Sequence, residues 1–365
     1  MADGGDDRDE DRIARLRLIR TPGIGPVTYH QLLQRYGSPT AAIEAVPELA
    51  RRGGGRPPAI APRAAIEREV AAVAALGARY LFRGIGLYPR LLAESEGAPP
   101  VLIVKGELGL LDRPSVALVG ARNASAAAVR FARMLASGLA ERRMVVVSGL
   151  ARGIDTAAHQ GSLASGTIAV VAGGVDIVYP PENDALQREI GERGLIVAEQ
   201  PPGTEPRARH FPYRNRIIAG LAAGTVVVEA APKSGSLITA RYAAEFGREV
   251  MAVPGSPLDQ RAQGCNLLIR EGATLVQTVD DIVEAVSSIG GGLATPARSY
   301  SGPPPADAGD AERRTVIALL GPVPVPVDEL IRQTGLPPAI VQTVLLELEL
   351  GGRLDRHAGG RVSIA

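Results

Sequence analysis

The segment from Gly203 to Gly220, GTEPRARHFPYRNRIIAG, concentrates the residue types that bind nucleic acid. Its guanidinium groups match phosphate oxygens with paired N–H donors, and an exposed aromatic ring offers a face on which an unpaired base can stack. Duplex DNA hides its base faces, so single-stranded nucleic acid is the first ligand to consider. A solvated arginine-rich loop is the alternative. The segment has one acidic residue, Glu205. Its basic and aromatic residues are Arg207, Arg209, His210, Phe211, Tyr213, Arg214 and Arg216.

A second candidate for nucleic-acid binding is the loop GARNAS, residues 120–125, which follows an apolar strand-like run. Arg122 stands where a dinucleotide-binding GxGxxG loop has its second glycine, and its side chain would crowd a pyrophosphate against the backbone. An arginine beside Ser125 at the start of a helix instead favours a phosphate seat. A surface arginine next to a serine N-cap is the alternative interpretation.

Further loops repeat this arrangement. SGLARGIDTAAH, residues 148–159, opens a helix with glycines that permit close backbone approach, and its candidates for DNA contact are Gly149, Arg152 and Gly153. We interpret Asp155 as a helix cap or packing residue and His159 as a structural histidine.

The loop APKSGSLITA, residues 231–240, contributes Lys233, Ser234 and Gly235, which precede a helix and can form an anion-binding nest. A serine and glycine loop of this kind has little specificity by itself.

The motifs of the common enzyme classes are missing from the sequence. There is no GxxxxGK[ST] phosphate loop, GxSxG turn, HExxH or cysteine and histidine cluster. The only cysteine is Cys265, and the four histidines are widely separated. We therefore expect a protein that is not an enzyme, with no catalytic residue, metal or cofactor.

Composition indicates a soluble cytoplasmic protein. Hydrophobic residues make up 45% of the chain, and the net charge of +1 means that a nucleic-acid surface must be a local patch. No apolar run is long enough to span a bilayer, the acidic N-terminus lacks the features of a signal peptide, and a single cysteine suits a reducing compartment.

The elements that must position these loops follow from periodicity. From residue 115 to 287, apolar β-branched runs alternate with helical stretches, which predicts a doubly wound parallel α/β sheet. Ligands of such sheets bind outside the carboxyl ends of the strands, where these loops lie. We expect an acidic disordered tail (1–10), a helical N-terminal domain (11–80), a Rossmann-like DNA-binding core (81–287), a Gly/Pro linker (288–310) and a winged-helix domain (311–365).

Both terminal domains have patterns found in DNA-binding modules. Two helices flank the glycine hairpin PGIG, residues 22–25, whose backbone N–H groups could meet phosphate, with Arg15, Arg17, Arg20 and Arg35 nearby. A packing turn is the alternative. The third winged-helix helix, residues 339–350, contains Glu347 and Glu349 and no basic residue, so we expect a protein-binding or structural role for it.

Taken together, seven stretches resemble, in order and spacing, the DNA-processing protein A family, also called Smf: VGARNAS, VSGLARGIDTAAH, GGVDIVYPPEN, HFPYRNRIIAGL, KSGSLITARYAAEFG, VMAVPGS and GCNLLIREGA. The resemblance covers essentially the whole chain. It implies an extended Rossmann-like core that protects incoming single-stranded DNA, forms a homodimer and helps load the RecA recombinase in natural transformation, without catalysis and without a membrane.

The resemblance also implies residue roles. Arg122 and Ser125 match the family's phosphate loop, and Phe211 matches its base-contacting aromatic. Arg214, Asn215 and Arg216 match its RNR stretch. Arg207 and Arg209 are both candidates for the basic residue shortly before the aromatic, and Ala121 stands where many members have serine.

Two alternatives of other classes remain. The first is a Rossmann-type nucleotide (phosphoribo)hydrolase, whose PGGxGTxxE pattern supplies an acid near the ribose. The nearest stretches here, AGGVDIVYP and KSGSLITA, lack the glutamate at that spacing. The second is a scaffold in which the core serves only to dimerise.

Overall fold

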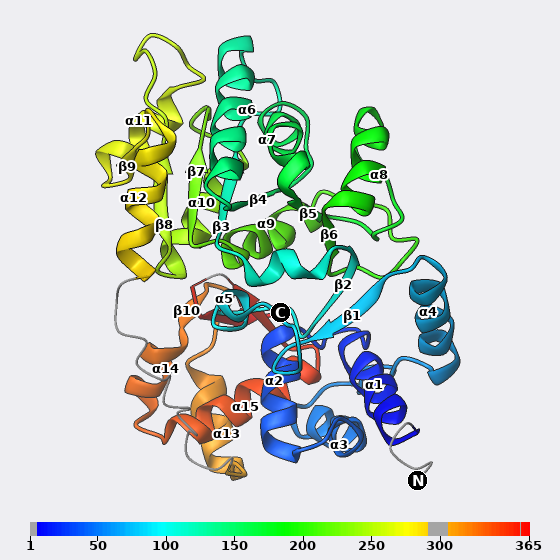
Figure 1. The fold of residues 1–365 in the computed structure, drawn as a ribbon. Coiled ribbons are helices and arrows are strands. Elements are labelled where there is room, and N and C mark those ends of the chain that lie inside the picture. The colour runs from blue at the N-terminus through cyan, green and yellow to red at the C-terminus, as the bar shows by residue number, and fades with distance from the viewer. Residues whose placement is uncertain (1–5, 291–305, 358) are drawn as a thin grey trace. The chain divides into compact units, whose positions relative to one another are not determined.

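The computed structural model describes residues 6–290, 306–357 and 359–365 (Figure 1). Internal contacts divide the chain into a terminal unit, residues 1–68 and 294–365, and a core unit, residues 69–293. The N-terminal and C-terminal modules therefore pack into one unit, and the core unit is inserted between them in sequence.

A nine-stranded sheet lies at the centre of the core unit, in the order β1-β2-β6-β5-β4-β3-β7-β8-β9. Neighbouring strands from β6 to β9 are parallel, which confirms the predicted doubly wound sheet. β1 and β2 are antiparallel additions at one edge that we did not predict, because they precede the alternating pattern. The bounds are β1 Arg79–Phe82, β2 Val101–Gly106, β3 Ser115–Val119, β4 Val145–Ser148, β5 Thr167–Val171, β6 Leu195–Ala198, β7 Gly224–Val227, β8 Glu249–Ala252 and β9 Thr274–Leu275.

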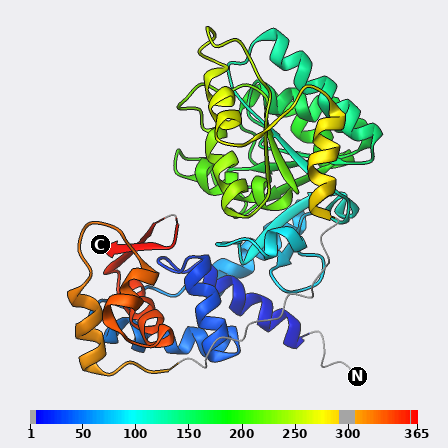
Figure 2. The same cartoon turned by 90° about the vertical axis from the view of Figure 1, so that its left-hand side faces the viewer.

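Helices cover both faces of this sheet, which explains why the strands are apolar throughout (Figure 2). In β3, Ala117 and Val119 pack with α9, α10 and α11, whereas Val116 and Leu118 pack with α6, α7 and α12. The helices of the core unit are α4 Arg63–Ala75, which begins in the terminal unit, α5 Arg90–Ala93, α6 Ala126–Glu141, α7 Ile154–Ser162, α8 Asp184–Arg193, α9 His210–Leu221, α10 Ser236–Glu245, α11 Gln263–Arg270 and α12 Val279–Gly290.

The N-terminal part of the terminal unit has three helices: α1 Asp6–Ile19, α2 Pro26–Tyr36 and α3 Pro39–Arg52. The two helices predicted around PGIG are α1 and α2. Because α1 begins at Asp6, residues 6–10 are helical and not part of a disordered tail; residues 1–5 lie outside the described residues.

We had considered that the arginines near the PGIG turn contact a DNA phosphate. In the structure, several of them instead bind groups of the terminal unit. Arg15 pairs with Asp11, and the Nε of Arg17 donates to the carbonyl oxygen of Ala61 at 3.0 Å. The side chain of Arg35 donates to the hydroxyl of Thr343 at 2.9 Å.

The C-terminal module has the predicted winged-helix order, with α13 Asp310–Ala318, α14 Val327–Thr334, α15 Pro338–Leu350 and the hairpin of β11 Leu354–His357 and β12 Arg361–Ile364. A short strand, β10 Val325–Pro326, completes its sheet. The expected linker falls mostly on residues 291–305, which lie outside the described residues.

Helix α15 is covered on two sides. Leu345 and Leu348 pack in the core of its own module, whereas Leu346 and Leu350 pack among the residues of α1, α2 and α3. The acidic face that we expected to repel phosphate is not presented to solvent. Glu347 is 1% exposed and accepts hydrogen bonds from Arg313, and Glu349 accepts one from Arg356 at 2.7 Å.

Candidate nucleic-acid interface

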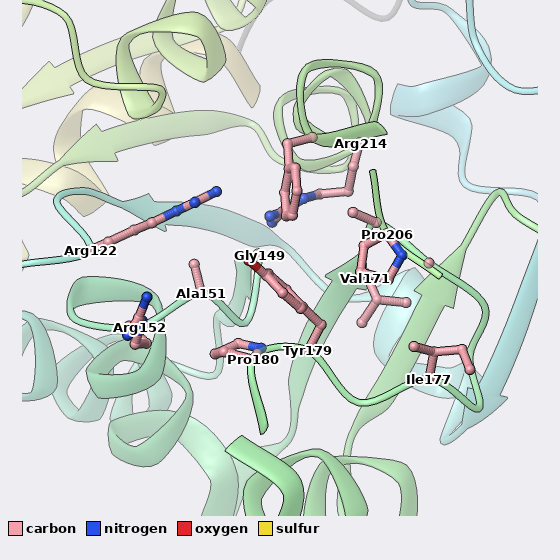
Figure 3. Close-up of a pocket in the computed structure, with 13 residues that line it drawn as sticks. Arg122, Gly149, Ala151, Arg152, Val171, Ile177, Tyr179, Pro180, Pro206 and Arg214 are labelled. Atoms are coloured by element: carbon pink, nitrogen blue, oxygen red, sulfur yellow. The ribbon is translucent and has the colours of Figure 1, made fainter. Parts of the chain in front are cut away.

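A pocket of the core unit opens where β4 and β5 end (Figure 3). The loops after β3, β4 and β5 and the start of α9 bring its walls together, as expected for the carboxyl edge of a parallel sheet. No acidic residue is among those that line it. Its lining includes three arginines and two aromatic side chains: Arg122, Arg152, Arg214, Tyr179 and Phe211.

Phe211 lies in the first turn of α9 and is partly buried at the pocket. Its ring centroid is 5.5 Å from that of Tyr179, with the two planes inclined at 53°. The Cζ atoms of Arg122 and Arg214 lie 4.9 and 6.0 Å from the Phe211 centroid. Both guanidinium groups are therefore within cation–π distance of one ring.

Arg214 is buried, with 6% of its surface exposed, so it is not the surface cation that we expected. Its side chain extends from α9 into the pocket toward Arg122 (Figure 3). Within the described part of the chain its guanidinium forms no hydrogen bond, and its Nε is buried without a partner. Burial lowers the pKa of Arg214 to about 10, although the nearby Asp155 carboxylate favours the charged form.

The Asp155 carboxylate favours the charged form of this arginine. Asp155 is 6% exposed and accepts a hydrogen bond from the backbone N–H of Ala151 at 3.3 Å. Burial raises the pKa of its carboxyl, and the charge of Arg214 opposes that effect. This agrees with our interpretation of Asp155 as a packing residue at the start of α7.

Gly149 is required by the close approach of Arg214. A Cβ atom at position 149 would lie 1.3 Å from Nη1 of Arg214. Gly153 lies at the other end of the loop and adopts a φ of +78°, which favours glycine. Both glycines therefore serve to bring the loop after β4 against its neighbours.

The structure shows contacts within the protein at the start of α6, where we predicted a phosphate contact. Ser125 is the N-cap of α6, and its Oγ accepts from the backbone N–H of Ala128 at 3.1 Å. The same hydroxyl donates to Glu229 at 2.6 Å, and the Ser125 backbone N–H donates to the other Glu229 oxygen at 3.0 Å. A carboxylate therefore occupies the position where we expected a phosphate, and only the Arg122 half of the motif faces the pocket.

Arg216 also has a charged partner within the core unit. It is 7% exposed, and its Nη2 donates to both carboxylate oxygens of Glu199, at 2.6 and 2.8 Å. A buried ion pair of this kind joins α9 to the end of β6. The charge of Arg216 is therefore matched within the core unit by Glu199.

The remaining candidates lie around the pocket. Arg207 and Arg209 are exposed before α9, while His210 is buried and its Nδ1 accepts from the Arg207 backbone N–H at 3.3 Å. Burial, followed by the charges of Arg209 and Arg207, lowers the pKa of His210. Arg152 is exposed at the pocket, 3.4 Å from Glu182.

The loop after β7 lies outside the pocket lining. Asn215 donates to the carbonyl oxygen of Gly235 at 3.2 Å, and Ser234 shares a hydrogen bond with Ser236 at 2.8 Å. Lys233 is exposed on this loop. Asn215 therefore fixes the position of the loop.

Tyr179 is the pocket residue that the sequence analysis missed. It belongs to the stretch GGVDIVYPPEN, which we quoted without assigning a role to its aromatic residue. Tyr179 is 44% exposed, and its ring packs beside Phe211. An aromatic residue in a loop after a buried strand was the available indication.

His159, by contrast, is the buried structural histidine that we expected. Its Nδ1 shares a hydrogen bond with the Thr167 hydroxyl at 2.9 Å. Burial, with a smaller effect of the Arg214 charge, lowers its pKa to about 3. His159 is therefore neutral at physiological pH.

The described residues lack two features of other protein classes. No group of three or more histidine, cysteine, aspartate or glutamate side chains in residues 6–290, 306–357 and 359–365 could hold a metal ion. Over those same ranges, no helix has the length and apolar character needed to cross a membrane.

Comparisons with known proteins support this organisation. Residues 79–287 match the family model "DNA recombination-mediator protein A", residues 9–72 match "DprA-like N-terminal HHH domain", and residues 301–360 match "DprA winged helix domain". The chain is 49% identical over 198 residues to the DNA processing protein DprA of Streptococcus pneumoniae, covering 54% of this chain and 70% of that protein.

Solved structures of DNA processing protein A are similar to this chain. The X-ray structure of the Streptococcus pneumoniae DNA processing protein A has a TM-score of 0.64 and 38% identity, covering 74% of this chain and 97% of that one. A Helicobacter pylori DNA processing protein A, described for its single-stranded DNA binding mode, has a TM-score of 0.52 and 27% identity over 58% of this chain and 97% of that one.

Proposed function

The chain belongs to the DNA recombination-mediator protein A family, and on that premise we propose that it binds single-stranded DNA at the pocket of Arg122, Phe211 and Arg214. The observation that carries the proposal is the approach of two guanidinium groups to one aromatic ring, at 4.9 and 6.0 Å. Guanidinium groups bind backbone phosphates and the ring stacks an unpaired base.

The rest of the interface follows from exposure. Arg207, Arg209 and Arg152 are exposed next to the pocket or at it, so they can contact the phosphates that flank the stacked base. Lys233 is exposed on the loop after β7 and extends the cationic surface of the core unit. Ser125, Asn215 and Arg216 contribute indirectly, because each is bonded to another part of the core unit.

We propose that the protein is not an enzyme. The phosphoribohydrolase alternative needs a carboxylate that can act on a nucleotide, and the lining of the pocket contains no aspartate or glutamate. Incubating the protein with nucleoside monophosphates and measuring the release of free base tests this point directly. Sustained release of base that scales with protein concentration would contradict it.

As partners we propose a second copy of the chain and the RecA recombinase, in natural transformation. The family resemblance supports both proposals. Light scattering of the purified protein tests the homodimer. A strand-exchange assay, in which RecA must displace a single-strand binding protein with and without this chain, tests recombinase loading.

The experiment that tests the DNA-binding proposal compares fluorescence anisotropy of single-stranded and double-stranded oligonucleotides at several salt concentrations. We expect tighter binding of the single strand. Arg122→Ala should weaken binding and lower the salt slope by about 0.7, the value for one phosphate contact on a single strand. An unchanged affinity and slope would remove Arg122 from the interface.

A further inference from the structure

Arg122 and Arg214 bring two positive charges together in the pocket, an arrangement that a bound anion would stabilise. Their guanidinium groups point toward each other from the loop after β3 and from α9 (Figure 3). Like charges at this proximity disfavour each other, and the charge of Arg122 contributes to the lowered pKa of Arg214.

The burial of Arg214 is a second indication that the pocket binds an anion. Arg214 is 94% buried, and within the described ranges its guanidinium forms no hydrogen bond. A buried guanidinium without hydrogen bonds is costly, and proteins keep such groups where a ligand supplies the acceptors. The Asp155 carboxylate favours the charged form of Arg214 but does not line the pocket.

The chemistry of the lining defines the ligand. The side-chain polar groups of three arginines are donors only, so the ligand must bring acceptors and negative charge. Phe211 and Tyr179 add two rings whose centroids are 5.5 Å apart, which suits a planar base. A phosphate and a base joined through one sugar are the parts of a single nucleotide.

We propose that this pocket binds one nucleoside monophosphate as a unit, with its phosphomonoester between Arg122 and Arg214 and its base against the rings of Phe211 and Tyr179. A phosphomonoester carries a charge of about −1.5 to −2 at pH 7, which matches two guanidinium groups better than the single charge of a phosphodiester. The proposal rests on the proposed single-stranded DNA binding at the same pocket and extends it to a small ligand.

Two sources present this chemistry: a free nucleotide and the 5′-phosphorylated end of a strand. The nucleotide should remain intact, because no aspartate or glutamate is among the residues that line the pocket. Nucleotide in the pocket would exclude the strand, so free monophosphates should compete with single-stranded DNA.

Calorimetric titration of the full chain tests the proposal with three probes: thymidine 5′-monophosphate, thymidine and inorganic phosphate. We expect the monophosphate to bind at least about tenfold more tightly than either part alone, since hydrogen bonds to charged groups are worth this much. Equal binding of thymidine and its monophosphate would overturn the phosphate seat.

Three variants separate the pocket from general charge. Arg122→Ala and Arg214→Met should each weaken monophosphate binding by about tenfold or more. Arg130→Ala removes an exposed arginine of α6 outside the pocket and should leave it unchanged. Arg122 is exposed, so its variant keeps the test valid even if Arg214→Met fails to fold. Equal losses in Arg122→Ala and Arg130→Ala would overturn the proposal.

Competition distinguishes failure of this inference from failure of the proposed function. The readout is displacement of a fluorescent oligothymidylate by thymidine 5′-monophosphate, and a 5′-phosphorylated strand is compared with a 5′-hydroxyl strand. Displacement supports the shared pocket, and tighter binding of the phosphorylated strand assigns the seat to strand ends as well. Strand binding without any monophosphate binding overturns this inference and leaves the DNA-binding function intact. Monophosphate binding without any strand binding would support this inference and overturn the proposed DNA-binding function.

Discussion

The guanidinium group of Arg122 lies over the ring of Phe211, with its Cζ 4.9 Å from the ring centroid. This contact occupies a surface that a stacked base would use. A phosphate that draws Arg122 away from the ring would therefore also prepare the ring for a base. Phosphate contact and base stacking are in this way expected to depend on each other.

Phe211→Ala should weaken single-stranded DNA binding by about 1 to 3 kcal/mol, the usual value for one base on an aromatic ring. The salt slope should remain the same, because no phosphate contact is lost. In a double-mutant cycle with Arg122→Ala, the two losses should not add, since the side chains are in contact. If instead the melting temperature drops and affinity of the folded variant is unchanged, Phe211 is a packing residue.

Gly149→Ala should reduce DNA binding through Arg214. The added Cβ would lie 1.3 Å from Nη1 of Arg214, so the guanidinium has to leave its position. Gly321→Ala is the matched control, because nothing lies within 4 Å of the Cβ there. Oligonucleotide affinity and melting temperature of both variants provide the check. Parental affinity in a folded Gly149→Ala protein would show that the placement of Arg214 is irrelevant to binding.

Arg216→Ala should lower the stability of the fold and leave the DNA contacts unchanged. The side chains of Arg216 and Glu199 are 9% and 19% exposed, and removal of the arginine breaks this largely buried ion pair. We expect a loss of about 3 to 5 kcal/mol in the free energy of unfolding. Denaturant unfolding measures this, and the salt slope of the folded fraction should equal that of the parent. A stable variant with a reduced slope would restore Arg216 to the DNA interface.

Leu346→Asp should separate the modules of the terminal unit. Leu346 is 3% exposed and packs among the N-terminal helices, so a charge there is buried without a partner. Val323→Asp in the same module is the control, because Val323 is 72% exposed. Hydrogen exchange should rise across α1, α2 and α3 in the first variant only. Single-stranded DNA affinity should stay within about threefold, a change of less than 1 kcal/mol, as the pocket lies in the core unit.

Acid should destabilise the core unit through His159. Its pKa is about 3 in the folded protein, compared with about 6.5 in an unfolded chain. Since the folded value is depressed, its contribution is complete above pH 6.5 and is lost as pH falls toward 3, at up to about 1.4 kcal/mol per pH unit. His159→Gln removes the titration. Urea unfolding at pH 7 and pH 5 should show a smaller decrease for this variant, and an equal decrease would mean that other groups are responsible.

The sequence alone determined the fold class of the core and predicted at which edge of the sheet its candidate site lies. Apolar runs separated by helices can only be buried on both faces of a parallel sheet, and the carboxyl ends of parallel strands share one edge. The loops of Arg122 and Gly149 could therefore be assigned to one site, with the start of α9 and its Phe211 added as a candidate from composition. The order of α13, α14, α15 and the final hairpin also followed from local pattern.

Only the tertiary structure decided which cations face the pocket and which pair with carboxylates. Arg214 and Arg216 are two residues apart in one motif, yet Arg216 meets Glu199 and Arg214 enters the pocket without a hydrogen bond. Ser125 is likewise bonded to Glu229, which is 104 residues away. Spacing along the chain gives the direction of a side chain on its own helix but not the charge that it meets from another element. That partner depends on how distant segments pack, which local periodicity does not specify.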